Sequence, residues 1–117
     1  MSRNGSARSI VERQLLAYNT RDVDAYCALF AQDAALLRLE HGEFEELARG
    51  VDAIRAYYTE RFKNPRLHCE IKARIELGNF VVDHECVRGI GERALEVIAI
   101  YEVRDTLIRS VRLIWPQ

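Results

Sequence analysis

The pattern of apolar and polar residues changes period halfway along the chain. In the first half, apolar residues recur every three or four positions, as on amphipathic helices. This spacing predicts a helix from Ser9 to about Tyr18, a second from Asp22 to about Phe30, and a third from Val51 to about Lys63. Residues 34–40 are short and apolar and are expected to be extended, whereas the acidic stretch 41–49 has no assignable pattern.

The second half alternates with the two-residue period of β-strands. From Leu67 to Leu77 apolar and polar residues alternate without a break, which predicts a long strand with one solvated face. Gly78-Asn79 is typical of a tight turn, and further strands are expected at 80–88, 94–103 and 107–115. The segment 94–103 is apolar on both faces, so we expect a central strand that is covered on two sides.

This order of elements predicts an α+β fold. Three helices come first, one strand lies between the second and third, and a meander of four strands follows. The helices are expected on one face of a curved, mostly antiparallel sheet, and the curvature leaves a hollow between the layers. We expect a single domain over residues 9–117, preceded by a flexible tail at residues 1–8.

Composition and charge narrow the possible partners. The 117 residues carry 17 Lys and Arg against 18 Asp and Glu, and this near-neutral balance argues against a nucleic-acid partner. No apolar run approaches the roughly 20 residues of a membrane span. The first nine residues lack the apolar core of a signal peptide, so no membrane partner and a cytoplasmic location are expected. Three cysteines, Cys27, Cys69 and Cys86, have no metal or redox spacing and are expected to be buried thiols.

Motifs for a bound cofactor are missing from the sequence. His41, His68 and His84 do not have the spacing of zinc ligands. No glycine-rich turn joins a strand to a helix, and no serine lies in a nucleophile motif. The sequence therefore predicts neither a metal nor an organic cofactor.

Four stretches of the sequence carry a family resemblance. They are residues 18–25 (YNTRDVDA), 29–34 (LFAQDA), 50–58 (GVDAIRAYY) and the closing strands through Trp115. In this order they resemble the NTF2-like superfamily, in particular its SnoaL-like and ketosteroid-isomerase-like branch, over about residues 9–115. The resemblance implies an NTF2-like cone that encloses a pocket for a small-molecule ligand, and a homodimer. It does not choose an activity, because the superfamily holds isomerases, cyclases, hydrolases and non-catalytic binders.

The resemblance also allows the family's catalytic positions to be checked. Ketosteroid isomerases use an Asp base, together with a Tyr and a protonated Asp that hydrogen-bond the oxyanion. A gapless comparison puts Gln14 at the Tyr position, Arg38 at the base position and Ala99 at the second Asp position. Arg38 cannot accept a proton at neutral pH and Ala99 offers no donor, so this mechanism is disfavoured.

Strand parity and the same comparison place His84 on the pocket side, between Val82 and Cys86. Imidazole titrates near neutral pH, so His84 is the candidate general acid-base. The alternative is a core histidine that is hydrogen-bonded to a neighbour. If the register were shifted by one residue, Asp83 and Glu85 would enter the pocket and His84 would leave it.

Arg38 is expected across the pocket, where it could bind a carboxylate or an enolate. The alternative is an arginine that reaches outward or pairs with an acid such as Glu40. The other residues expected around the ligand are Gln14, Tyr18, Val97, Ala99, Tyr101 and Trp115.

Two functions of different classes fit these expectations. The first is a cofactor-free isomerase, cyclase or hydrolase that acts on a small apolar carbonyl or anionic compound, with His84 moving protons. The second is a non-catalytic ligand-binding or dimerisation module. In either case the last strands are apolar on both faces, and one helix layer covers only one of them, so a homodimer through the sheet is expected.

Overall fold

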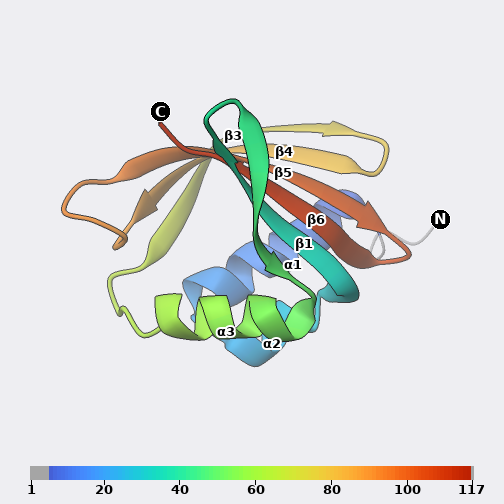
Figure 1. Ribbon diagram of the computed structural model, residues 1–117, viewed down its shortest axis with the longest axis horizontal. Helices are drawn as coiled ribbons and strands as arrows, with labels where there is room; N and C mark the ends of the chain where they lie inside the picture. The colour runs from blue at the N-terminus through green and yellow to red at the C-terminus, as the bar shows by residue number, and fades with distance from the viewer. Residues whose placement is uncertain (1–5, 117) are drawn as a thin grey trace.

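A computed structural model describes residues 6–116, and residues 1–5 and 117 lie outside the described part. Three helices pack on one six-stranded sheet that is not closed (Figure 1). The helices are α1 (Ala7–Asn19), α2 (Val23–Cys27) and α3 (Val51–Arg61). The strands are β1 (Phe30–Glu40), β2 (Glu43–Arg49), β3 (His68–Leu77), β4 (Phe80–Arg88), β5 (Leu95–Arg104) and β6 (Leu107–Ile114).

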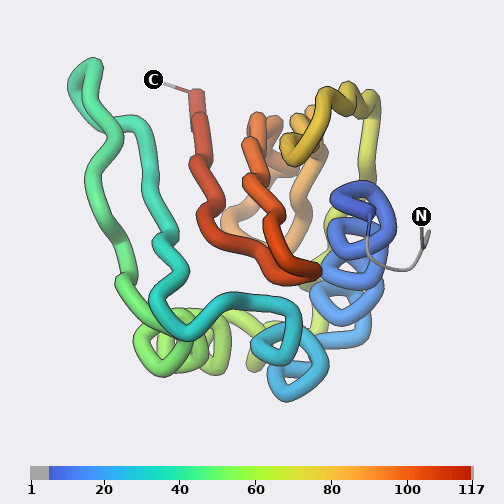
Figure 2. Tube along the Cα trace, turned by 90° about the vertical axis from the view of Figure 1, so that its right-hand side faces the viewer, coloured from blue at the N-terminus to red at the C-terminus, as the bar shows by residue number. Residues whose placement is uncertain are grey.

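The strands lie in the order β2-β1-β6-β5-β4-β3, and only β1 and β6 are parallel. All three helices lie on the same side of the sheet, which curves over them (Figures 1 and 2). Helix α1 packs against β3, β4 and β5, while α3 packs against β1 and β2. The expected α+β fold, with helices on one face of a curved and mostly antiparallel sheet, is confirmed.

The first two helices differ in length from the sequence prediction. Ser6, rather than Ser9, caps α1, because its hydroxyl accepts a hydrogen bond from the Ser9 backbone N–H at 3.1 Å. Of the expected tail, residues 1–5 lie outside the described part, and Ala7 and Arg8 belong to the helix. Helix α2 ends at Cys27, because Phe30 already pairs with Ile108 at the start of β1.

Strand β2 occupies the acidic stretch that had no assignable pattern. It pairs with β1 and forms an edge of the sheet, so most of its side chains are exposed. Two consecutive acids, Glu45 and Glu46, interrupt the alternation that would have indicated a strand. An edge strand does not need a strictly alternating pattern, because little of it is buried on either face.

A β-bulge changes the two faces of β3. Ile71 pairs with Glu85 but Ala73 pairs with His84, so the register shifts at Lys72. Before the shift, the apolar residues of β3 face the helices. After it, Ile75 and Leu77 face outward, with 68% and 81% of their surface exposed.

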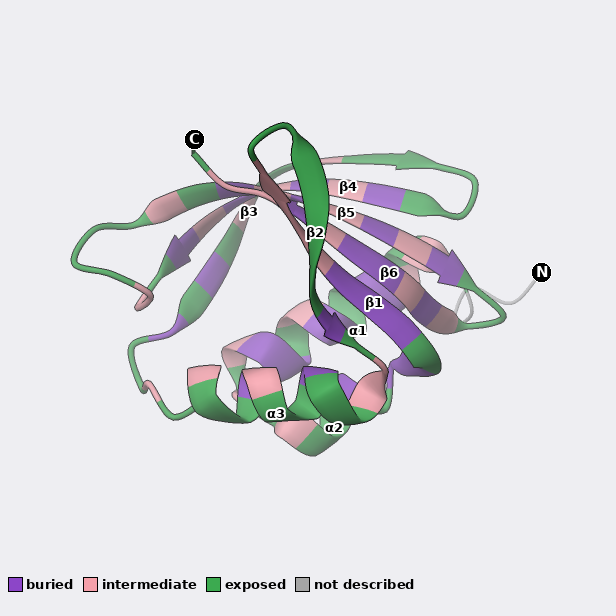
Figure 3. Cartoon of the chain, in the orientation of Figure 1, coloured by how far each residue is buried: buried purple, intermediate pink, exposed green. Residues whose placement is uncertain are grey.

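The core lies between the helices and the concave face of the sheet, where Figure 3 shows the buried residues in purple. Aromatic rings from all three helices meet here. Tyr26 is at their centre, with ring centroids 4.5 Å from Tyr58, 5.1 Å from Phe30 and 5.4 Å from Phe62. Among the described residues, no helix combines the length and the apolar character that a membrane crossing needs.

Candidate functional site

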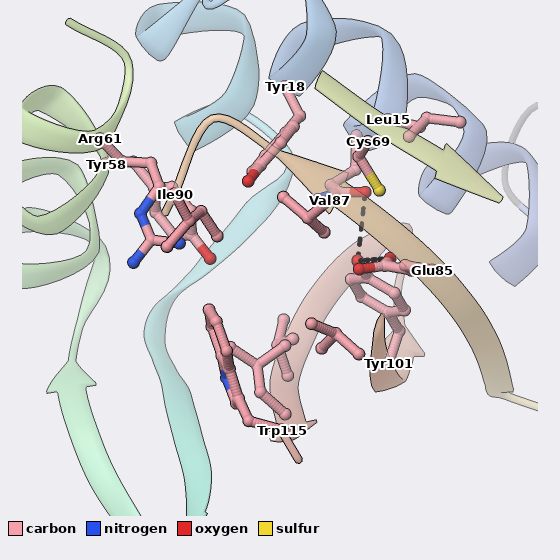
Figure 4. A pocket seen from close by; sticks show the side chains of 14 residues that line it. Leu15, Tyr18, Tyr58, Arg61, Cys69, Glu85, Val87, Ile90, Tyr101 and Trp115 are labelled. Atoms are coloured by element: carbon pink, nitrogen blue, oxygen red, sulfur yellow. Dashed lines mark hydrogen bonds between the residues drawn. The ribbon is translucent and has the colours of Figure 1, made fainter. Parts of the chain in front are cut away.

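A pocket opens between the helices and the sheet (Figure 4). Its walls are mostly apolar and aromatic, and the few polar groups come from α1, α3, β3, β4 and β5. About 30 Å³ is free for the centres of water-sized molecules, which is room for one or two waters. A larger ligand therefore has to move some of the wall side chains. The lining residues are Gln14, Leu15, Tyr18, Tyr58, Arg61, Cys69, Glu85, Val87, Ile90, Val97, Tyr101, Val111, Leu113 and Trp115.

Two acidic side chains of β4 point into the protein. Asp83 and Glu85 are 1% and 7% exposed, and they pair across the sheet with Ala99 and Val97 of β5. Buried carboxyl groups are rare unless they are paired or protonated. Asp83 has a cationic partner, whereas Glu85 has none among the described residues.

Asp83 is held by an arginine. Arg74 donates hydrogen bonds to both carboxylate oxygens, from Nε at 2.6 Å and from Nη2 at 3.0 Å. The two side chains form a bidentate ion pair, which raises the pKa of Arg74. Arg74 reaches Asp83 because the bulge at Lys72 turns its side chain to the inner face.

Glu85 has only neutral partners. Its Oε2 accepts a hydrogen bond from the Tyr101 hydroxyl at 3.3 Å, and that hydroxyl also lies 3.4 Å from Oε1 of Gln14 (Figure 4). No Lys, Arg or His within the described chain forms an ion pair with it. Burial raises the pKa of Glu85 to about 7, and the nearby Asp83 charge adds to the effect. Glu85 therefore exchanges its proton near neutral pH.

The tyrosines around Glu85 are neutral hydrogen-bonding groups. Burial is the main cause that raises the pKa of Tyr18, Tyr26, Tyr58 and Tyr101 well above the usual range. The hydroxyl of Tyr26 accepts a hydrogen bond from Nε2 of Gln14 at 3.4 Å, which extends the network away from the pocket. These side chains can donate to a ligand oxygen without becoming charged.

Arg61 and Trp115 form the wall opposite Glu85 (Figure 4). The Arg61 guanidinium lies 5.8 Å from the Trp115 ring centroid and 5.2 Å from that of Tyr57, and its Nη2 donates to the Tyr57 hydroxyl at 2.9 Å. Arg38 also contacts the Trp115 ring. It does not line the pocket, and its guanidinium is 4.9 Å from the Trp115 ring centroid.

The expected orientation of three β4 residues is wrong. Val82, His84 and Cys86 lie on the outer face of the sheet, while the side chains between them point inward. The His84 side chain is 40% exposed, and its Nε2 lies 2.9 Å from Oε1 of Glu96. Near the turn between β3 and β4, apolar residues of the two strands share one face, as Ile75 and Val82 do. The bulge at Lys72 puts this face on the outside of the sheet. The shifted register, with Asp83 and Glu85 inside, is the one observed.

The other sequence candidates lie closer to their expected places. Gln14, Tyr18, Val97, Tyr101 and Trp115 line the pocket. Ala99 is fully buried on the same face but does not reach the lining. Arg38 forms an ion pair with Glu40, with Nε 3.0 Å from Oε1, as its alternative interpretation held.

Several site residues were not singled out from the sequence, among them Arg61, Tyr58 and Cys69. Arg74 was also missed, because it lies on the polar side of an apparently unbroken alternation. One usable signal existed in β4. Val81 and Val87 have the same parity as the two acids, and both valines are buried. Over residues 6–116, no three His, Cys, Asp or Glu side chains gather as metal ligands would.

The profile of a known family, the SnoaL-like domain, matches residues 11–111. The chain belongs to the SnoaL-like domain family. No curated protein matches the sequence. The SnoaL-like assignment agrees with the observed fold and with the resemblance found in the sequence.

Solved structures share this SnoaL-like fold at low sequence identity. A candidate ketosteroid isomerase from Kribbella flavida has a TM-score of 0.80 and 18% identity, covering 95% of this chain and 78% of its own. An uncharacterised cystatin-fold protein from Novosphingobium aromaticivorans has a TM-score of 0.79 and 24% identity, with 92% and 97% covered. A candidate polyketide cyclase from Sinorhizobium meliloti has a TM-score of 0.73 and 21% identity, with 89% and 92% covered. These similarities show the fold alone.

Proposed function

We propose that this SnoaL-like protein is a cofactor-free enzyme that transfers a proton on a small carbonyl compound, with Glu85 as the general acid-base. The observation that carries the proposal is a buried carboxyl group in the pocket wall that has no cationic partner among the described residues, and burial raises its pKa to about 7. A catalytic acid-base is most effective when its pKa lies near the working pH. Glu85 thus takes the role that the sequence suggested for His84.

The reaction that fits this site is an isomerisation through an enolate. Ionised Glu85 removes a proton from the carbon next to the carbonyl, and the C–H electron pair forms the enolate. Glu85, whose carboxyl proton can exchange with water, then delivers a proton to another carbon of the conjugated system, so nothing is oxidised or reduced. The neutral hydroxyls of Tyr18 and Tyr58, which line the pocket, are the proposed hydrogen-bond donors to the enolate oxygen.

The pairing of Asp83 with Arg74 supports this division of roles. If both acids competed for one proton, neither would have a defined charge. Arg74 binds both carboxylate oxygens of Asp83, whereas Glu85 has no such partner and is the acid whose pKa burial raises to about 7. Asp83 and Arg74 are therefore proposed as positioning residues, since neither of them lines the pocket.

Exchange of substrate protons with deuterium tests the proposal without knowledge of the natural substrate. A set of small enones, ketones and oxo acids is incubated with the protein in D₂O, and loss of C–H signals is followed by NMR. We expect exchange with the wild type and a loss of 10²- to 10⁴-fold in Glu85→Gln. Glu96→Gln, an exposed acid-to-amide change on the outer face, is the matched control.

Two outcomes would contradict the proposed enzymatic function. Exchange at the wild-type rate in Glu85→Gln would exclude Glu85 as the base. Absence of exchange for every compound that binds the wild type would favour the alternative, a non-catalytic ligand-binding module. The small free volume of the pocket is the observation that supports this alternative.

We also propose that the protein forms a homodimer through the outer face of the sheet. Ile75, Leu77 and Phe80, which we call the outer apolar patch, are exposed where β3 and β4 meet. The helices cover only the opposite face, so a second copy would remove these side chains from water.

The three cysteines are free thiols, which fits the reducing cytoplasm as the proposed location.

A further inference from the structure

The pocket wall contains one cationic side chain. Of its lining residues, only Arg61 and Glu85 carry a charge at neutral pH, and Figure 4 shows them on opposite sides of the pocket. Arg61 is half-buried in the last turn of α3. Its charge is therefore part of the surface that a ligand meets.

Arg61 has no acidic partner within the described chain. Its contacts are neutral ones, namely the hydroxyls of Tyr57 and Tyr18 and the rings of Tyr57 and Trp115. Seven other arginines within residues 6–116 are paired with carboxylates, as Arg74 is with Asp83 and Arg38 is with Glu40. A cation that faces a pocket and has no counter-charge is suited to an anionic ligand.

The surroundings of Arg61 favour a planar anion. The two aromatic rings near the guanidinium restrict its orientation, and the Tyr57 hydroxyl occupies one of its five N–H donors. Donors remain for the two oxygens of a carboxylate, whose geometry matches the fork of an arginine. The apolar side chains of Ile90 and Val87 lie between Arg61 and Glu85 (Figure 4).

We infer that the ligand of this pocket is a small carboxylic acid with a flat apolar body, whose carboxylate is bound by Arg61 at the wall opposite Glu85. This assigns the anion-binding role to Arg61 rather than to Arg38. The inference rests on the proposed function only for the placement of the reacting carbon near Glu85. The binding of the carboxylate can be measured without any turnover.

Pairs of carboxylates and their amides provide the test. Cinnamate and 3-benzoylacrylate are each compared with the primary amide of the same acid by isothermal titration calorimetry, at ligand concentrations up to about 10 mM. For the wild type we expect the carboxylate to bind at least tenfold more tightly than the amide, as a charge-assisted hydrogen bond implies. Arg61→Gln should lose this preference while its amide affinity is unchanged.

Two further variants make the result specific. Arg38→Gln should keep the wild-type preference, because Arg38 already pairs with Glu40 and does not line the pocket. Glu85→Gln should also keep it, so a failure of the proposed catalysis would leave the carboxylate preference intact. The inference is overturned if no carboxylate binds the wild type, if acid and amide bind equally, or if Arg61→Gln keeps the preference. Melting temperatures of all variants show whether each protein is folded.

Discussion

Arg74 binds Asp83 through both carboxylate oxygens, at 2.6 and 3.0 Å, in a place where only 1% of Asp83 is exposed. The next inward-facing residue on the same strand, Glu85, has no such partner. One arginine therefore separates two neighbouring buried acids into an ionised pair and a group that exchanges its proton near pH 7.

Removal of this arginine should destabilise the protein strongly. Arg74→Met leaves Asp83 buried and unpaired, and we expect the free energy of unfolding at pH 7 to fall by about 3–5 kcal/mol. Chemical denaturation with urea measures the change. Arg104→Met, which breaks the more exposed pair with Glu102, is the control and should cost no more than about 1 kcal/mol. The double change Arg74→Met and Asp83→Leu should recover most of the loss, and a loss as large as that of Arg74→Met alone would contradict this explanation.

Glu85 should make the protein less stable as the pH rises from about 4.5 to about 7. Its pKa is raised from 4.5 to about 7 by folding, so in this interval the folded state holds a proton that the unfolded state has released. The contribution of Glu85 to stability is complete below pH 4.5 and is lost above pH 7. It amounts to about 3 kcal/mol, since each pH unit between the two pKa values corresponds to about 1.4 kcal/mol.

Glu85→Gln isolates this effect, because its amide has no charge to lose. As the pH rises from 5 to 8, we expect the variant to become more stable relative to the wild type. Thermal denaturation at several pH values in this range measures the difference. Glu43→Gln changes an exposed acid of β2 and should leave the slope unaltered. Equal pH slopes for the wild type and Glu85→Gln would show that the pKa of Glu85 is the same in the folded and unfolded states, and would contradict the explanation.

His84 should matter little to either stability or binding. Its side chain is 40% exposed on the outer face and contacts Glu96, which is itself exposed. We expect His84→Ala to change the free energy of unfolding by less than about 1 kcal/mol and to leave ligand affinity unchanged. A loss of ligand binding in this variant, with its melting temperature intact, would contradict the orientation of β4.

The outer apolar patch should control the oligomeric state. Ile75→Lys and Phe80→Glu place charges on this face without touching the pocket, and each should shift the protein from dimer to monomer. Light scattering after size-exclusion chromatography gives the mass directly. Leu16→Lys is the control, because Leu16 is an equally exposed leucine on α1, away from the sheet's outer face. A wild type that is monomeric at about 10 µM would rule out a stable dimer.

Much of the fold could be predicted from local patterns. Helical spacing located α1 and α3, alternation located β3, and apolar segments between turns located β4, β5 and β6, because each of these elements buries one face or both. Strand β2 could not be found in this way, since it is an edge strand with few buried side chains. The parallel pairing of β1 with β6 depends on contacts between distant parts of the chain, which no local pattern encodes.

The site was harder to predict than the fold, for one physical reason. The bulge at Lys72 adds a residue to β3 without disturbing the alternation of the sequence. Apolar side chains such as Ile75 and Leu77 therefore seemed to mark the inner face, and His84 seemed to lie with them. The ion pair of Arg74 with Asp83 shows which face is buried at this point. This pair forms only when β3 and β4 are paired in the shifted register, which the sequence pattern does not reveal.

The most direct test of this account is the pKa of Glu85 itself. Selective ¹³C labelling of glutamate, with assignment by Glu85→Gln, allows the Glu85 carboxyl carbon to be followed by NMR from pH 4 to pH 9. The account predicts an apparent pKa of about 7 in the wild type and a lower value in Asp83→Asn, where the repelling charge is removed. A wild-type pKa near the usual value of about 4.3 would contradict the central claim, because Glu85 would then be an ordinary carboxylate at neutral pH.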